Sequence, residues 1–233
     1  MAALSRKGRT DSRLTKLVVN HTKFTHVSEQ FRTIRTNLQH SVNTGKIKSI
    51  VITSARDGEG KSFAAANLAV TLAAENKRIL LVDADFRKPS IHKIFKTENS
   101  RGLTTLLTNP SLSPKHLVIM NQVNNLYVLP SGPIPSNPSE LLNSERMNDL
   151  INEMEAEYDL IIYDMPPVLS LTDAQIVSGK VDGTIFIISK GYVTEEDVTK
   201  AGELLSIVDA KIIGAIINKV ERSKRKYIYV PES

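Results

Sequence analysis

Residues 49–75 constrain the fold of this chain more than any other stretch. An apolar run (SIVIT) is followed by SARDGEGKS at 54–62 and by an alanine-rich helical pattern at about 61–75. Glycines allow successive backbone N–H groups to face one anion, and the N-terminus of the following helix adds positive partial charge. Strand, glycine-rich loop and helix in this order are the setting that a phosphate-binding loop requires. We therefore predict a nucleotide site formed by Asp57, Gly58, Glu59, Gly60, Lys61, Ser62 and Phe63.

Two side chains of this loop carry the expected chemistry. The ammonium group of Lys61 would neutralise the β- and γ-phosphates, and the hydroxyl group of Ser62 would be a ligand of Mg²⁺. Ala55 takes the place of the first glycine of the usual pattern, but it is small enough for the loop to close. Because glycines also mark ordinary turns, the loop by itself predicts nucleotide binding and no particular reaction.

The rest of the chain predicts an α/β fold with a doubly wound, mostly parallel sheet. Apolar runs typical of strands buried on both faces occur at 49–53, 78–83, 126–130, 159–164, 184–189 and 212–218. Helical patterns are expected at 26–41, 61–75, 146–157 and 195–208, and the Pro-rich stretch 130–138 is expected to be a loop. Strand–helix alternation in 233 residues indicates one domain at 26–221, between tails at 1–25 and 222–233.

Two of the apolar runs end in aspartate. Asp83 and Asp85 follow the run at 79–82, and Asp164 follows the run at 161–163. Since the carboxyl ends of parallel strands form one ligand-binding edge, these carboxylates would lie near Lys61. Aspartate is also a common turn former at the ends of strands. Two such strands beside a phosphate loop nevertheless favour a site that holds a metal ion.

Charge and composition limit the cellular location and the partners that can be expected. The net charge is +5, and the basic residues concentrate at 1–17 and 222–233, whereas 18–221 is slightly acidic in sum. Basic ends are either solvated tails or segments attracted to an anionic membrane or an acidic partner. Nucleic acid is a weaker option because no recognised binding motif occurs. Without cysteine, a secretory leader or an apolar run of roughly 18 residues, the chain is expected to be cytoplasmic and to reach a membrane only peripherally or through a partner.

Three stretches together resemble a known family. The phosphate loop, LLVDADFR at 80–87 and IIYDMPP at 161–167 are similar to the Walker A, A′ and B motifs of the bacterial tyrosine kinases of capsule and exopolysaccharide synthesis. RKPSIH at 87–92 and GPIPSNPSELL at 132–142 match the same family, and the resemblance covers about 26–229. It implies a P-loop NTPase fold of the deviant Walker A type, ATP and Mg²⁺ as cofactors, and phosphoryl transfer to protein tyrosine.

The resemblance also implies a role for each matching residue. Catalysis would fall to Lys61, Asp83 and Asp85, with Asp83 the better candidate to orient or deprotonate the tyrosine hydroxyl. Mg²⁺ would be held by Ser62, Asp83 and, through water, Asp164. Asn218, at the end of the last strand, would contact adenine. Arg87 could pair with a carboxylate or touch phosphate in an assembly, and both alternatives stay open.

The C-terminal tail KRKYIYVPES supplies the expected phospho-acceptors, Tyr227 and Tyr229, which would enter the active site of another subunit. The family usually has a longer tyrosine cluster, so the match is partial. The alternative is an edge strand, because Tyr-Ile-Tyr-Val has β propensity.

An assembly motif is expected near the start of the domain. Glu29, Arg32 and Arg35 share one helix face and resemble the E-x-x-R-x-x-R motif that pairs subunits of that family in a ring. The alternative is an ion pair within the helix. The resemblance further implies a separate transmembrane adaptor that recruits the chain to the inner face of the plasma membrane, other cytoplasmic protein substrates and a cognate tyrosine phosphatase.

A positioning ATPase of the same P-loop class, acting at a membrane or nucleoid, is the alternative function. The phosphate loop of such proteins resembles the pattern K-G-G-x-G-K-[ST], and its first lysine reaches the active site of a partner subunit. Here Arg56 holds that position and is followed by Asp57. A non-catalytic scaffold fits poorly, because the set of Lys61, Ser62, Asp83 and Asp164 is intact.

Overall fold

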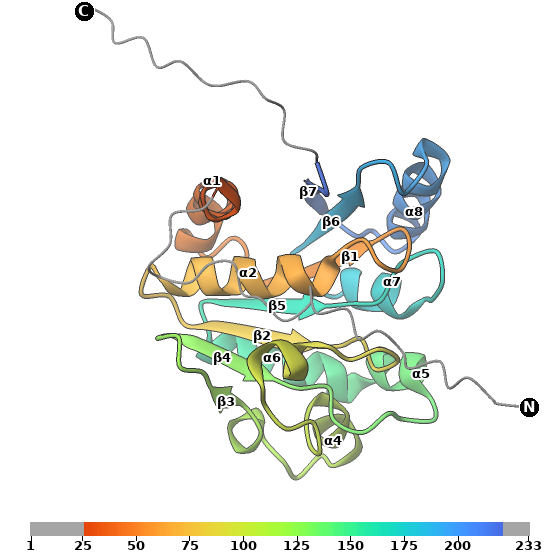
Figure 1. Cartoon of the computed structure of the whole chain (residues 1–233). Helices are drawn as coiled ribbons and strands as arrows, with labels where there is room; N and C mark the ends of the chain where they lie inside the picture. The colour runs from red at the N-terminus through yellow and green to blue at the C-terminus, as the bar shows by residue number, and fades with distance from the viewer. Residues whose placement is uncertain (1–25, 221–233) are drawn as a thin grey trace, which may run out of the picture.

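The computed structural model describes residues 26–220, except for the side chains of His26, His40 and Ser41. The expected tails, with Tyr227 and Tyr229, lie outside the described residues. The elements follow one another as α1 (His26–Asn43), β1 (Ser49–Ser54), α2 (Lys61–Ala73), β2 (Ile79–Asp83), α3 (Ile91–Phe95), α4 (Leu103–Thr108), η1 (Pro114–His116), β3 (Ile119–Met120), β4 (Leu126–Leu129), α5 (Pro138–Asn143), α6 (Glu145–Glu157), β5 (Leu160–Asp164), α7 (Asp173–Ser178), β6 (Gly183–Ser189), α8 (Glu195–Ile207) and β7 (Ile212–Asn218) (Figure 1).

The strands form one sheet in the order β3-β4-β2-β5-β1-β6-β7. All neighbouring strands pair in parallel except β3 and β4, which are antiparallel. The predicted doubly wound α/β fold is therefore confirmed, and each predicted strand and helix is present within one or two residues of its expected ends. The strand β3 and the short helices α3, α4, α5 and α7 were not predicted, because two to six residues are too few to show a period.

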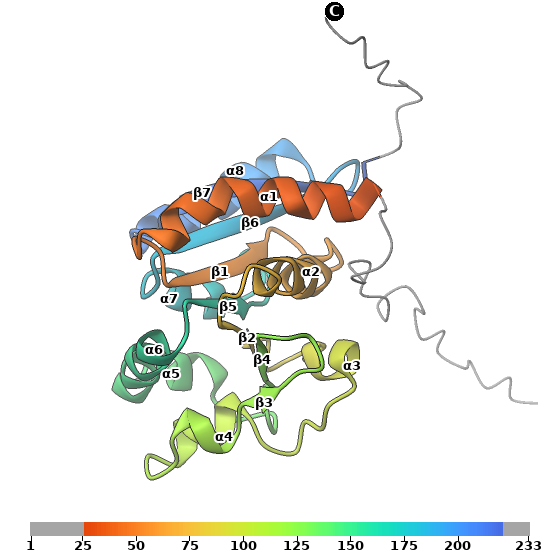
Figure 2. The same cartoon turned by 90° about the vertical axis from the view of Figure 1, so that its left-hand side faces the viewer.

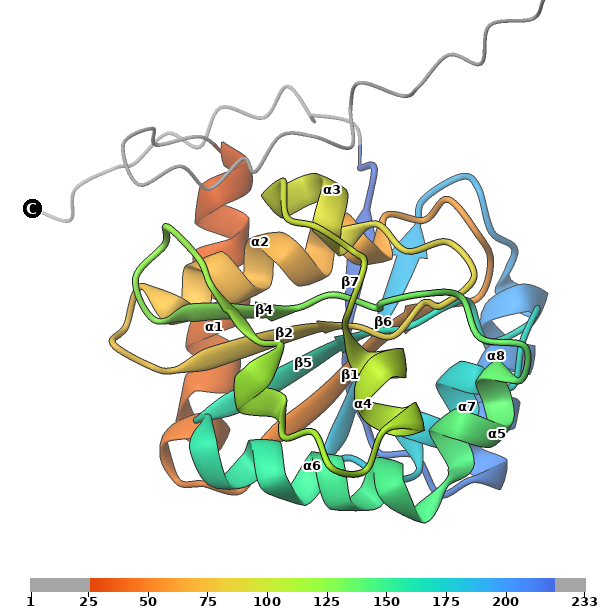
Figure 3. The ribbon, with the colours of Figure 1, turned by 90° about the horizontal axis from the view of Figure 1, so that it is seen from below.

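Each face of the sheet carries its own layer of helices (Figure 3). Alternate residues of a strand point to opposite faces. Ile50 and Ile52 of β1 pack with α1, α2 and α3, whereas Val51 packs on the other face with α4 to α8. The alanines of α2 are buried, so this helix lies close to the centre of the sheet, and α1 lies beside it (Figure 2). The double cover explains why the strands read as continuous apolar runs.

The edge strand β7 is much less covered than the central strands, and Ile212 and Ile217 are exposed. It pairs with β6 as far as Asn218, so its end lies at the same edge of the sheet as the end of β1. Among the helices within residues 26–220, none is both long and apolar enough to cross a bilayer.

Candidate active site

The strand order brings the three motifs to one place. The strands β2, β5 and β1 are neighbours in the sheet. At their C-terminal ends lie, in the same order, Asp83 and Asp85 (the A′ aspartates), Asp164 (the Walker B aspartate) and the phosphate loop. Asp164 is in register with Asp83 on one side and with Ile52 on the other. The predicted meeting of these carboxylates with the phosphate loop is therefore a consequence of the sheet topology.

The loop between β1 and α2 has the backbone that a phosphate loop needs. Gly58 and Gly60 have φ values of +79° and +95°, which favour glycine. Ala55 is fully buried, so the residue in place of the first glycine fits without exposing the loop. Lys61 begins α2 and is 7% exposed, which places its cation inside the site rather than in solvent.

The two A′ aspartates are held differently. Asp83 is fully buried, and its Oδ2 accepts hydrogen bonds from the backbone N–H groups of Ser90 and Ile91, both at 2.9 Å, where α3 begins. Its Oδ1 has no partner among the described residues. Asp85 is 6% exposed, and its Oδ1 accepts from the Lys88 N–H at 3.0 Å.

Asp164 is the least satisfied of the three carboxylates. It is fully buried, and neither of its oxygens has a hydrogen-bond partner among the described residues. Burial raises its pKa to about 7, and the positive charge of Lys61 is the main influence that opposes this rise. Burial also raises the pKa of Asp83 well above its usual range, and the charge of Asp164 adds to this effect.

These carboxylates fit Mg²⁺. Buried carboxylate oxygens without partners are costly unless a cation satisfies them. The described residues contain no cluster of three or more His, Cys, Asp or Glu that could hold a metal ion by themselves. Mg²⁺ does not require one, since it is held by one or two carboxylates together with water and substrate phosphates. Ser62, Asp83 and Asp164 match that donor set.

Glu59 holds the phosphate loop through its own side chain. Its carboxylate is fully buried and accepts hydrogen bonds from the N–H of Arg56 at 2.7 Å and the N–H of Ser189 at 2.8 Å. The sequence placed Glu59 in the loop, but no sequence signal indicated that it joins the loop to the end of β6. The carboxylate therefore fixes the loop's backbone to the sheet.

Arg56 is engaged within its own subunit. Its Nε and Nη2 donate to the two carboxylate oxygens of Asp197, each at 2.8 Å. Asp197 lies in the first turn of α8, and it forms a capping box with Thr194, the residue just before the helix. Arg56, with lesser help from Thr194, lowers the pKa of Asp197 to about 2.

Two further ion pairs surround the A′ segment. The Lys88 ammonium lies 2.6 Å from the carboxylate of Asp57, which joins A′ to the phosphate loop. Arg87 lies 3.5 Å from Asp173, a buried residue at the start of α7 that also accepts a hydrogen bond of 2.6 Å from Ser139. Of the two alternatives for Arg87, the carboxylate pair is present. The sequence analysis assigned no role to Asp173 or to Ser139, although Ser139 lies within the stretch 132–142 that resembles the family.

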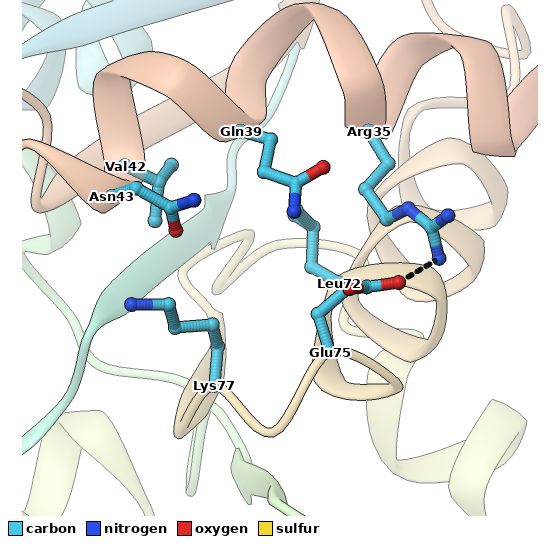
Figure 4. A pocket seen from close by; sticks show the side chains of 7 residues that line it. All are labelled: Arg35, Gln39, Val42, Asn43, Leu72, Glu75 and Lys77. Carbon is cyan, nitrogen blue, oxygen red and sulfur yellow. Dashed lines mark ion pairs between the residues drawn. The ribbon is translucent and has the colours of Figure 1, made fainter.

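The helix α1 bears the expected assembly motif. Glu29 and Arg32 form an ion pair within the helix, whereas Arg35 reaches Glu75, just beyond α2, at 2.8 Å. Arg35 and Glu75 line a hollow of 280 Å³ between α1 and the end of α2 (Figure 4). Leu72, on its wall, lies 11 residues or about 16 Å along α2 from Lys61, so the hollow is separate from the nucleotide site.

Two further residues expected at the nucleotide site, Phe63 and Asn218, make defined contacts. Phe63 packs edge-to-face on Phe31 of α1, with ring centroids 6.3 Å apart, so its ring contributes to helix packing. Asn218 lies against the phosphate loop and donates from Nδ2 to the carbonyl oxygen of Glu59 at 2.7 Å. An adenine contact of Asn218 stays a prediction.

Comparison with known proteins places this site in a family. A family model described as an AAA domain matches residues 47–212. Tyrosine-protein kinase YwqD of Bacillus subtilis is 47% identical over 84% of this chain and 83% of its own length. Putative tyrosine-protein kinase CapB of Staphylococcus aureus is 36% identical over 95% of this chain and 97% of its own length.

Comparison with solved structures points to the same family. The chimerical protein CapA2B2 aligns with a TM-score of 0.83 and 38% identity, over 88% of this chain and 90% of that one. The kinase domain of Escherichia coli tyrosine kinase ETK aligns with a TM-score of 0.79 and 30% identity, over 88% and 80%. The septum site-determining protein MinD of Pyrococcus horikoshii, at 24% identity and a TM-score of 0.64, shares the fold. Motifs, site geometry and relatives together show that this chain belongs to the bacterial tyrosine-protein kinases of the AAA-domain, P-loop class.

Proposed function

We propose that this kinase uses MgATP to phosphorylate Tyr227 and Tyr229 in the tail of a second copy, and that it regulates capsule or exopolysaccharide synthesis. The observation that carries the phosphoryl-transfer site is the register of Asp83 with Asp164 beside the buried Lys61. This places two carboxylates and a cation at the edge of the sheet where a phosphate loop begins a helix. Phosphoryl transfer depends on such positioning and charge neutralisation.

Each side chain has a part in the transfer. Lys61 holds the β- and γ-phosphates, and Ser62, Asp83 and Asp164 hold Mg²⁺, which neutralises charge on the phosphates when it is bound. The tyrosine oxygen forms a bond to the γ-phosphorus, the bond to the β-phosphate oxygen breaks, and ADP leaves. The hydroxyl proton passes to a carboxylate at the end of β2, and Asp83 is the better candidate because its Oδ1 has no hydrogen-bond partner among the described residues.

The partners belong to the same proposal. A ring of identical subunits, joined through Glu29, Arg32 and Arg35, would bring each tail to a neighbouring site. A separate transmembrane adaptor would recruit the cytoplasmic chain to the inner face of the plasma membrane. Other cytoplasmic proteins would be further substrates, and a tyrosine phosphatase would reverse the modification.

Phosphate mapping tests the proposal. The purified chain is incubated with Mg²⁺ and labelled ATP, alone and with the cytoplasmic tail of a membrane adaptor, and the product is analysed by mass spectrometry. We expect phosphotyrosine at Tyr227 or Tyr229 in the wild type and none in Lys61→Met. Release of free phosphate without labelled protein under both conditions would refute the kinase function and favour the positioning ATPase.

A mixing experiment tests transfer between subunits. Lys61→Met keeps its tyrosines but loses the phosphate cation, whereas the double variant Tyr227→Phe, Tyr229→Phe keeps the site but loses both acceptors. Neither variant should label its own tail alone. The mixture should carry phosphate on the Lys61→Met chain, identified by its mass. A mixture that stays unlabelled while the wild type is labelled would show that the tail reacts within its own subunit.

A further inference from the structure

The end of β7 holds two consecutive carbonyl groups of the phosphate loop. Asn218 Nδ2 donates to the carbonyl oxygen of Glu59 at 2.7 Å, and Lys219 Nζ donates to the carbonyl oxygen of Gly58 at 2.8 Å. These two carbonyls belong to adjacent peptide units in the curled part of the loop. The donors come from residues about 160 positions away in the chain, so the contact is a product of the fold.

Holding a carbonyl also orients an N–H group. A peptide unit is planar and trans, so its C=O and N–H point in opposite directions. The bond from Lys219 to Gly58 therefore directs the N–H of Glu59 away from Lys219. In the same way, the bond from Asn218 to Glu59 directs the N–H of Gly60 away from Asn218. These are donors of the loop that must face an anion together.

The holding side chains are themselves fixed. The Oδ1 of Asn218 accepts from the N–H of Lys219 at 2.8 Å, so both polar atoms of this amide are engaged within the chain. The backbone carbonyl of Asn218 accepts from Lys190 at 3.0 Å, which ties the strand end to the end of β6. The Lys219 ammonium lies 5.0 Å from the centroid of the Tyr192 ring, a cation–π contact that keeps it over the loop.

Gly60 makes this close approach possible. A Cβ atom at Gly60 would lie 2.3 Å from Asn218 Nδ2, which is well inside contact distance. The second glycine of GEGKS thus serves Asn218 as well as the curl of the loop.

We propose that Asn218 and Lys219 are positioning residues that orient the N–H groups of Glu59 and Gly60 to the anion-binding side of the phosphate loop. The inference rests on the nucleotide site of the proposed function, and it is independent of which tyrosines accept phosphate. Loss of either side chain weakens binding of any polyphosphate, with or without a base.

Calorimetry with three ligands tests the role of Asn218. Wild type and Asn218→Ala are titrated with Mg²⁺-ATP, Mg²⁺-GTP and inorganic triphosphate. We expect Asn218→Ala to weaken all three ligands, inorganic triphosphate included, by about 3- to 10-fold for the loss of one hydrogen bond. The exposed Asn152 on α6 gives the matched control, Asn152→Ala, which should change none of the affinities.

The role of Lys219 needs a charge control. Lys219→Met removes the bond to Gly58 and should weaken all three ligands, whereas Lys219→Arg should restore much of the affinity. Lys211→Met removes the same charge beside the other end of β7 and should have little effect. In the ligand-free protein, hydrogen exchange of a peptide covering 55–62 should be faster in Asn218→Ala and Lys219→Met, at an unchanged Tm.

The outcomes separate this inference from the proposed function. Weaker ATP binding with unchanged triphosphate binding in Asn218→Ala would make Asn218 a base-selecting residue, and would overturn the inference while the nucleotide site stands. Unchanged exchange at 55–62 in both variants would also overturn it. A wild type that binds none of the three ligands would refute the nucleotide site itself and the positioning role with it.

Discussion

Asp83 on β2 and Asp164 on β5 lie directly opposite each other in register, and both carboxyl groups are fully buried. Two buried carboxylates side by side repel each other and lose hydration, so each holds its proton more tightly than in water. Burial is the largest cause of the raised pKa in both residues; the charge of Asp164 adds to the rise at Asp83, and the charge of Asp85 adds to the rise at Asp164. The pair is thus a poor place for two negative charges until a cation joins it.

Replacing Asp164 with asparagine should stabilise the nucleotide-free protein at alkaline pH. A carboxyl group whose pKa is raised on folding contributes stability below its unfolded pKa of about 4, and this stability is lost as pH rises through the raised value. The amide of the variant does not titrate. We expect Asp164→Asn to unfold about 2–4 °C higher than the wild type at pH 8 for each ~1 kcal/mol gained. Scanning calorimetry at several pH values measures this difference.

Two controls accompany the Asp164 experiment. Below pH 4 the difference in Tm between variant and wild type should vanish, because the wild-type carboxyl is then protonated in both states. Mg²⁺ with ATP should stabilise the wild type and not the variant, since the ligand stabilises only the form that binds it. Equal Tm values at every pH would show that Asp164 is not an uncompensated buried charge.

Replacing Gly60 with alanine should disrupt the phosphate loop without unfolding the domain. The φ of +95° and the contact of 2.3 Å to Asn218 Nδ2 both oppose a Cβ atom, and such strain costs about 1–3 kcal/mol. We expect triphosphate binding to fall by at least ~10-fold, which calorimetry measures. Gly202→Ala in α8 is the matched control, because apart from its chain neighbours and the backbone of its own helix no atom lies within 4 Å of its Cβ position. It should raise stability by about 0.4–1 kcal/mol. Wild-type affinity in Gly60→Ala would contradict the geometry.

The sequence predicts the elements well where a long segment has one physical requirement. The central strands are buried on both faces, so SIVIT and LIIYD read as continuous apolar runs, and their parallel ends bring Lys61, Asp83 and Asp164 together. The helices α3, α4, α5 and α7 were missed because they are shorter than two turns. Their positions depend on tertiary contacts, such as the two backbone hydrogen bonds from the start of α3 to Asp83.

The contacts that hold the site were harder to predict than the motifs. Arg56 could be read as a departure from the lysine signature, but nothing in its neighbourhood indicated Asp197, which is 141 residues away. The same holds for Glu59 with Ser189 and for Lys219 with Gly58. Such pairs depend on which strands and loops become neighbours. A single sequence carries no periodic signal for that.

Replacing either Arg56 or Asp197 should have the same effect on ATP binding. Because this bidentate contact lies within the subunit, Arg56→Ala and Asp197→Ala should weaken ATP binding by similar factors, and the double variant should be no worse than either. Titration calorimetry of all four proteins completes the cycle. An ATP-dependent dimer lost only in Arg56→Ala would instead show that Arg56 acts across subunits, as in a positioning ATPase.

Acid should weaken the same pair only at very low pH. The pKa of Asp197 is lowered on folding to about 2, so the pair contributes stability above the ordinary carboxyl pKa and loses it as pH falls through about 2. The difference in Tm between wild type and Asp197→Asn should therefore be constant from pH 5 to 8 and should shrink below pH 4. A difference that already disappears at pH 6 would contradict the ion pair.

The two arginines of α1 should respond differently to mutation. Arg35 is 20% exposed and binds Glu75 across the helix pair, whereas Arg32 pairs with Glu29 on the surface of its own helix. Arg35→Ala should lower the free energy of unfolding by about 1 kcal/mol, and Arg32→Ala by no more than a few tenths, as denaturant titration would show.

Light scattering then tests whether the same two arginines take part in assembly. If this face joins subunits, Arg32→Ala with Arg35→Ala reduces the oligomer mass, while Glu75→Ala, which breaks only the contact within the subunit, leaves it unchanged. An identical mass in the wild type and the double arginine variant would exclude this face as the interface.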